Sequence, residues 1–270
     1  MPLVRRPDAE IHYEVFDFGP PWRRRTPVLL HHGLALSTRF WYSWLPTLLA
    51  DHPVIALDLR GHGRSSVPDP GWRWTFETLA EDALAVLDAA GYDRCHFVGE
   101  SVGGTLGLFC AARHPDRLVS LTAVSTAYRG DYVRNLDDWE DLLARGGSAG
   151  WSRAMMDRRF DPATIDPDLA AWYEVEQAKL APDTVLAIVR LLQGADLTDD
   201  LPRIAAPTLL LSPERSPFVE ADLMAQAHAL IPRSELLYFR GARHGLINSH
   251  PDACARAVVE FIRRRVTPTS

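Results

Sequence analysis

The chain has 270 residues, of which 47% are hydrophobic, and its formal net charge is -6. That length and hydrophobic content allow one large core, usually as a single domain that carries an insertion. The net negative charge argues against binding to nucleic acid. No apolar run approaches the roughly 20 residues that span a bilayer. The three cysteines lack the paired spacing of a disulfide or metal framework.

The first half of the chain alternates short apolar strands with helices. The alternating pattern of residues 11–18 predicts an exposed edge strand. Continuous apolar runs predict buried strands at residues 27–32, 54–58, 95–98 and 118–124, and amphipathic runs predict helices at 75–90 and 106–113. Such an order is typical of a parallel sheet with helices on both faces.

The strand at residues 95–98 runs into the segment Gly99-Glu100-Ser101-Val102-Gly103. A Gly-x-Ser-x-Gly turn between a strand and a helix is a nucleophile elbow, in which a serine sits on a strained bend between small residues. The helix that follows leaves the backbone N–H of Val102 free to donate to an anion. The segment therefore predicts Ser101 as a nucleophile and Val102 as half of an oxyanion hole.

The alternation of strands and helices stops between about residues 127 and 203. This segment has only helical and loop signals, and tryptophan and methionine are frequent in it. Strands at residues 207–211 and 235–239 then alternate with helices at 219–230 and 252–264. We expect a core domain made of residues 1–126 and 204–270. Residues 127–203 should form a helical cap inserted after the strand that follows the nucleophile helix, and its aromatic residues should enclose an apolar pocket.

Four segments, in this order, resemble the α/β-hydrolase fold family of esterases, enol-lactonases and C–C hydrolases. They are His32-Gly33-Leu34, residues 58–65, residues 99–104 and residues 241–245. The resemblance covers nearly the whole chain, and the cap region is most similar to 3-oxoadipate enol-lactonase-like members. It implies a mostly parallel central sheet flanked by helices with a helical cap, and it implies Leu34 as the second oxyanion donor.

His244 is the expected general base, because it follows the strand at 235–239 in a glycine-flanked loop, in the chain order Ser…acid…His. The acid is where the sequence departs from the family. The position that aligns with the family's aspartate is Ser216, and Glu214, two residues earlier, is the leading candidate. Other options are Glu220, Asp222, Asp131 or no acid at all.

These features predict a cytoplasmic serine hydrolase that acts on a small carboxylic ester or lactone through an acyl-enzyme on Ser101. Alternatives are a C–C bond hydrolase, a haloperoxidase-like enzyme, or a non-catalytic ligand-binding protein, which the missing aspartate favours. No cofactor, metal, nucleic acid or membrane partner is expected, and the oligomeric state stays open, with a homodimer as one option. Several arginines could reach an anionic group of the substrate: Arg129, Arg153, Arg158, Arg159 and Arg190.

Overall fold

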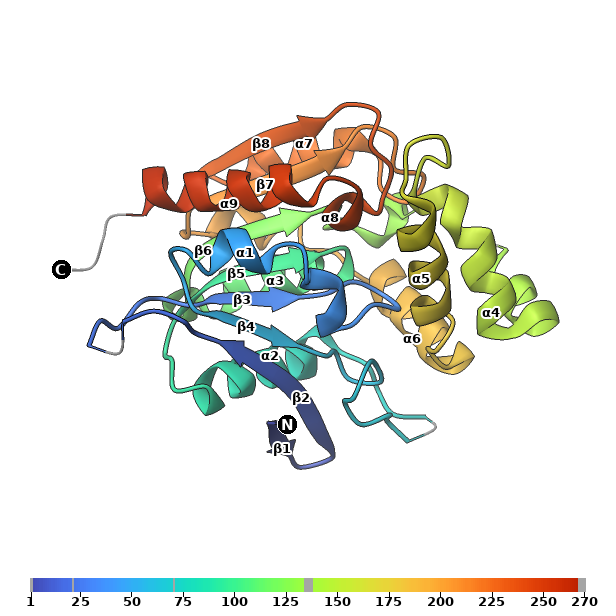
Figure 1. Ribbon diagram of the computed structural model, residues 1–270, viewed down its shortest axis with the longest axis horizontal. Helices are drawn as coiled ribbons and strands as arrows, with labels where there is room; N and C mark the ends of the chain where they lie inside the picture. The colour runs from blue at the N-terminus through green and yellow to red at the C-terminus, as the bar shows by residue number, and fades with distance from the viewer. Residues whose placement is uncertain (1, 21, 70, 134–137, 267–270) are drawn as a thin grey trace.

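The computed structural model describes residues 2–20, 22–69, 71–133 and 138–266, which contain one eight-stranded sheet (Figure 1). The sheet has the order β1-β2-β4-β3-β5-β6-β7-β8, and all neighbours from β4 to β8 are parallel. The strands are β1 (Leu3–Arg6), β2 (Ala9–Phe16), β3 (Val28–His31), β4 (Val54–Leu57), β5 (Cys95–Glu100), β6 (Leu118–Val124), β7 (Thr208–Pro213) and β8 (Ser234–Phe239). The mostly parallel sheet expected from the sequence is confirmed.

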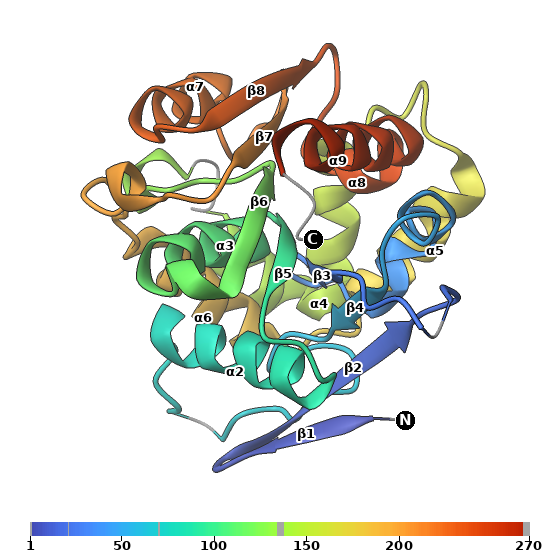
Figure 2. The same ribbon diagram turned by 90° about the vertical axis from the view of Figure 1, so that its left-hand side faces the viewer.

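Helices cover both faces of this sheet (Figure 2). The helices α2 (Phe76–Ala89), α3 (Val102–Arg113) and α7 (Ala221–Leu230) pack on one face, and α1 (Leu45–Leu48), α8 (Leu246–Ser249) and α9 (Pro251–Arg265) pack on the other. Within the described ranges, no helix has both the length and the apolar character needed to cross a bilayer.

The buried strands contribute side chains to two apolar layers, because successive side chains of a strand point to opposite faces of the sheet. Leu29 and Phe97 belong to the cluster under α2 and α3, whereas their neighbours Leu30 and Val98 belong to the cluster under α9. Each such side chain contributes about 1.5–3 kcal/mol when it is fully buried. The continuous apolar runs of these strands are therefore explained by burial on both faces.

The prediction that residues 11–18 form an edge strand is wrong. The strand β2 pairs antiparallel with β4 on one side and with β1 on the other, so β1 is the edge. His12 is buried because its Nδ1 lies 2.9 Å from an oxygen of the equally buried Asp58. A polar residue of this strand is tolerated in the interior because it has a hydrogen-bond partner there.

Between β6 and β7 the described residues form helices and no strand. The helices are η3 (Gly130–Tyr132), α4 (Trp139–Arg159), α5 (Pro167–Gln177), α6 (Pro182–Gln193) and η4 (Leu201–Arg203). Figure 1 shows α4, α5 and α6 beyond the carboxyl ends of the parallel strands. Residues 134–137 of the expected cap lie outside the described part of the chain, and the domain limits at 126 and 204 stay a prediction.

Helix α4 is bent at Gly147, whose φ of 59° and ψ of -165° are not helical. A straight helix rises about 1.5 Å per residue, which would place residues eight or more positions apart beyond side-chain contact. The bend instead brings the rings of Trp139 and Trp151 to a centroid distance of 5.0 Å. Both ends of α4 can therefore line the same pocket.

We expect Gly147→Ala to lower the free energy of unfolding by about 1–3 kcal/mol, because only glycine adopts this backbone conformation without strain. The neighbouring Gly146 is a matched control, since it is helical and a Cβ there meets nothing within 4 Å. Gly146→Ala should be neutral or stabilising by up to about 1 kcal/mol. Urea unfolding of both variants measures the difference, and equal midpoints would show that the bend at Gly147 is not required.

Candidate active site

Ser101 stands between the last residue of β5 and the first residue of α3, in a strained backbone conformation. Its φ is 53° and its ψ is -118°, and its N–H donates to the carbonyl of Val124 at 2.9 Å. A Cβ on Gly99 would lie 2.1 Å from the carbonyl oxygen of Gly103, and a Cβ on Gly103 would lie 2.4 Å from that of His31. The elbow therefore forms only because both flanking positions are glycine.

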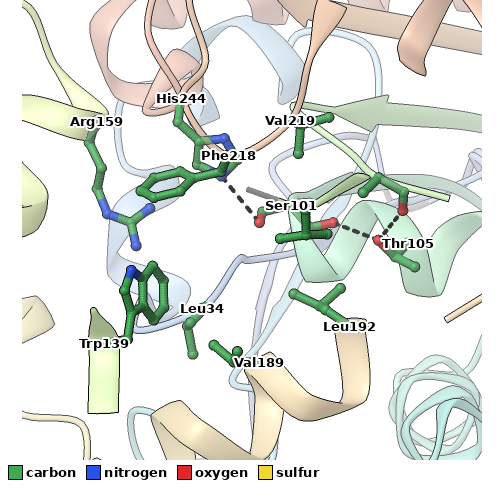
Figure 3. Close-up of a pocket in the computed structure, with 12 residues that line it drawn as sticks. Leu34, Ser101, Thr105, Trp139, Arg159, Val189, Leu192, Phe218, Val219 and His244 are labelled. Carbon is green, nitrogen blue, oxygen red and sulfur yellow. Dashed lines mark hydrogen bonds between the residues drawn. The ribbon is translucent and has the colours of Figure 1, made fainter. Parts of the chain in front are cut away.

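His244 lies in the loop between β8 and α8 and faces Ser101 (Figure 3). Its Nε2 is 3.2 Å from Ser101 Oγ, although the two residues are 143 positions apart in the chain. The loop is held by backbone contacts: Ser125 Oγ donates to the His244 carbonyl at 3.1 Å, and the N–H of Gly245 donates to the carbonyl of Arg159 at 2.9 Å. The structure brings together the two residues that the sequence selected.

Burial, and to a smaller extent the charge of Arg159, lowers the pKa of His244 to about 3. The imidazole is thus neutral at neutral pH and has a nitrogen free to accept a proton. The ring of Phe218 packs edge-on against it at 4.9 Å, which helps to fix its plane.

The second nitrogen of His244 contacts a serine instead of a carboxylate. His244 Nδ1 lies 3.0 Å from Ser216 Oγ, which also accepts hydrogen bonds from the N–H of Phe218 at 3.3 Å and of Val219 at 3.1 Å. These backbone bonds hold the Ser216 hydroxyl in place against the imidazole. Ser216 can orient His244, but it brings no negative charge.

The structure does not bring Glu214 to His244, which corrects the leading expectation for the acid. The N–H of Glu214 donates to the carbonyl of Phe239 at 3.1 Å, so the chain still follows β8 at this point. Its carboxylate accepts a hydrogen bond from the N–H of Gly241 at 2.7 Å on the exposed side of that turn. Of the other candidates, Asp131 pairs with Arg129, and Glu220 and Asp222 lie at the start of α7.

Glu100 contributes a carboxylate to this site that the sequence analysis did not predict. Its Oε1 is 3.9 Å from His244 Nε2, which makes it the one carboxylate of the described residues within 4.0 Å of that ring. The side chain is fully buried, and neither oxygen accepts a hydrogen bond of good geometry there. Burial raises the pKa of Glu100 to about 7, while the Arg159 charge and the Gly33 amide oppose the rise. A glutamate inside a fully buried strand is the signal that could have found it.

The loop after β3 is fixed beside Ser101 by His32. Its Nε2 accepts a hydrogen bond from the N–H of Leu59 at 2.9 Å, so the ring proton is on Nδ1, which donates to the Gly33 carbonyl at 2.7 Å. A Cβ on Gly33 would lie 1.8 Å from the Glu100 carboxylate. The loop therefore places the backbone of Leu34 close to the elbow.

Ser101 and His244 line a narrow cavity of about 30 Å³. Its wall is mostly apolar and is drawn from the core and from α4 and α6. The lining residues are Leu34, Ser101, Thr105, Ala127, Val133, Trp139, Arg159, Val189, Leu192, Phe218, Val219 and His244 (Figure 3).

A family model described as alpha/beta hydrolase fold matches residues 26–251. A protein of Azorhizobium caulinodans named "Putative carbamate hydrolase RutD" is 29% identical over 267 residues, which cover 97% of this chain and 98% of that protein.

Solved structures share the same architecture. The enol-lactonase from Burkholderia xenovorans LB400 has a TM-score of 0.88 at 24% identity, over 97% of this chain and 100% of that one. A thermophilic esterase from Thermogutta terrifontis has a TM-score of 0.82 at 26% identity, over 96% of this chain and 95% of that one. At its level of identity, the likeness to the enol-lactonase shows the fold alone.

Proposed function

The chain belongs to the alpha/beta hydrolase fold family, and from that premise we propose that it is a serine hydrolase of small carboxylic esters or lactones. One observation carries the proposal: Ser101 Oγ, on a strained elbow, is 3.2 Å from the Nε2 of a neutral, buried imidazole. A serine hydroxyl needs a base in such reach before it can attack a carbonyl carbon.

In the proposed first step, Ser101 Oγ attacks the carbonyl carbon while its proton moves to His244 Nε2. The C=O electron pair becomes an oxyanion, which the backbone N–H groups of Leu34 and Val102 stabilise, each by about 3–4 kcal/mol. As the oxyanion collapses, the C–O bond to the alcohol breaks, and Nε2 gives its proton to the leaving oxygen. The acyl group then stays on Ser101 as an ester.

In the second step, a water molecule gives a proton to His244 Nε2 and attacks the acyl-enzyme. A second oxyanion forms and collapses, and Ser101 leaves with the proton from Nε2. For a lactone, the alcohol and the acid remain in one product. In both steps the second ring proton stays on Nδ1, whose N–H donates a hydrogen bond to Ser216 Oγ.

The fit of the cavity supports a short acyl group. At about 30 Å³ between apolar walls, even a small ester must move side chains of the wall, and a long chain would have to displace α4 or α6. The name of the Azorhizobium caulinodans relative adds a carbamate to the candidate substrates, since a carbamate carbonyl undergoes the same attack. The neutral partner of His244 Nδ1 favours a second function, ligand binding without efficient turnover.

We expect ethyl acetate, ethyl butanoate and a small lactone to be hydrolysed with higher kcat/KM than ethyl octanoate, because the apolar cavity is short. Proton release in a pH-stat measures each rate, with Ser101→Ala protein as the blank. An N-alkyl ethyl carbamate belongs in the same panel. Efficient hydrolysis of emulsified triglyceride would contradict the narrow cavity, and no turnover of any substrate would favour the ligand-binding protein.

A further inference from the structure

Arg159 is a buried arginine that reaches into the proposed catalytic pocket. It is the last residue of α4, only 3% of it is exposed, and it lines the cavity with Ser101 and His244. Figure 3 shows its guanidinium extending past Phe218 toward Trp139 and Leu34. Its carbonyl accepts a hydrogen bond from the N–H of Gly245, which ties its position to that of the His244 loop.

The guanidinium of Arg159 makes no ion pair among the described residues, although its charge lowers the pKa of the buried Glu100. Its Nε is buried without a hydrogen bond. The guanidinium carbon instead lies 5.9 Å from the ring centres of both Tyr173 and Phe218. Buried charges are normally paired, because leaving one unpaired costs several kcal/mol.

Other arginines of the same helix are paired. Arg158 forms an ion pair with Asp138, and the exposed Arg153 pairs with Glu174 at 3.2 Å. The sequence of the cap thus supplies acids for the arginines that face solvent, but none for the one that faces the cavity. The positive charge of Arg159 acts on both titratable groups of the site, since it contributes to lowering the pKa of Glu100 and of His244.

We propose that Arg159 binds a carboxylate of the substrate, so that the preferred esters or lactones are themselves carboxylic acids. This inference rests on the proposed hydrolase function. A planar guanidinium matches a carboxylate through two parallel N–H···O bonds, which suits a small cavity better than a bulkier anion. The apolar remainder of the wall then holds the short chain that joins the carboxylate to the reacting carbonyl.

The test compares esters that differ only in a carboxylate. Ethyl hydrogen succinate is matched with ethyl 4-methylpentanoate, which has a neutral branched group in place of the carboxylate on the acyl side. Acetoxyacetate is matched with isobutyl acetate in the same way on the alcohol side. The native protein should prefer the anionic member of at least one pair. Equal kcat/KM within both pairs would overturn the proposal.

In Arg159→Gln we expect the anionic-to-neutral ratio of kcat/KM to fall by about thirtyfold or more, the size of a charge-assisted hydrogen-bonded pair. Arg159→Lys should keep part of that ratio, because it keeps the charge. Arg153→Gln is the matched control on the same helix and should leave both rates unchanged. A ratio that survives in Arg159→Gln would place the anion elsewhere.

A binding measurement separates this inference from the proposed function. Calorimetry should detect succinate binding to Ser101→Ala protein, and the binding should be lost when Arg159→Gln is added. Succinate binding without hydrolysis of any ester would retain the role of Arg159 and reject the hydrolase. Hydrolysis of neutral esters without succinate binding would retain the hydrolase and reject the role of Arg159.

Discussion

Ser101→Ala and His244→Ala are each expected to lower kcat by about four orders of magnitude or more, because they remove the proposed nucleophile and its base. The double variant should lose little beyond either single change, since the two groups act as a unit. Initial rates with the best ester or lactone of the panel measure these losses. Additive losses would show that Ser101 and His244 do not act in the same step.

Two changes outside the cavity serve as matched controls for these variants. Ser249 lies at the end of α8 and contacts His250, and His228 on α7 contacts Ser234, so neither reaches the cavity. Ser249→Ala and His228→Ala should keep near-native rates. If either control lost activity to the same degree as the site variants, damage to the fold would explain the losses.

Glu100→Gln is expected to lower kcat/KM by about a hundredfold at pH 8.5, because it removes the negative charge nearest to the imidazolium that forms during the reaction. Two charges about 4 Å apart interact by about 4 kcal/mol at an effective dielectric constant of about 20, and a hundredfold corresponds to about 2.7 kcal/mol. Ser216 cannot supply this charge from the other side of the ring. Glu100 at 3.9 Å is thus the candidate counter-charge.

The same change should alter the pH profile in a defined direction. The pKa of Glu100 is about 7, so kcat/KM of the native protein should rise as pH increases through 7, where the carboxylate forms. At pH 5.5 Glu100 is protonated and neutral, so the native protein and Glu100→Gln should have similar rates. A rise near pH 7 that persists in Glu100→Gln would assign it to another group.

Stability should change with pH in the opposite sense. Between its ordinary value of 4.5 and about 7, Glu100 holds a proton in the folded state that the unfolded chain has released. The native protein should therefore lose about 3 kcal/mol of unfolding free energy between pH 4.5 and pH 8 at this one group. Urea unfolding at both pH values should show that Glu100→Gln lacks this part of the loss.

A second variant tests the counter-charge without relying on the first alone. Ser216→Asp would place a carboxylate against His244 Nδ1, where Ser216 Oγ now lies at 3.0 Å. An ionised aspartate only accepts hydrogen bonds, so it also keeps the ring proton on Nδ1. Added to Glu100→Gln, it should recover at least about tenfold in kcat/KM at pH 8.5. No recovery would mean that the lost charge was not what Glu100 supplied.

The elbow and the histidine could be predicted from the sequence because their signals are local. Glycines at fixed spacing mark the strained turn at Ser101, and a glycine-flanked loop after a strand marks His244. Their contact then follows from topology, since β5, β6, β7 and β8 are neighbours in one parallel sheet. The carboxyl ends of these strands meet at the same edge, which brings together residues 143 positions apart.

The partner of His244 Nδ1 could not be predicted, because it depends on how one turn closes. Ser216 and Glu214 are two positions apart, and the choice between them is made by hydrogen bonds from the N–H groups of Glu214 and Arg215 to the end of β8 and to the turn after it. Charge alone favoured the glutamate, whereas the backbone of the turn directs that glutamate toward Gly241.

Glu100 and Arg159 show a second limit of sequence reasoning. Glu100 occupied a variable position of the elbow motif and Arg159 was one of five arginines, so neither stood out by type. What distinguishes both is the burial of polar atoms that make no hydrogen bond of good geometry, namely both carboxylate oxygens of Glu100 and Nε of Arg159. Only tertiary packing reveals such groups, although a charged residue inside a continuous apolar strand is a useful warning.

Covalent labelling with a fluorophosphonate probe tests the central proposal most directly, because the probe phosphonylates only an activated serine. Peptide mass spectrometry of the native protein should locate the label on Ser101. Labelling should be absent in Ser101→Ala and largely lost in His244→Ala, and it should remain in the Ser249→Ala control. A label that persists in Ser101→Ala, or that appears on a different serine of the native protein, would contradict the assignment of Ser101 as the nucleophile.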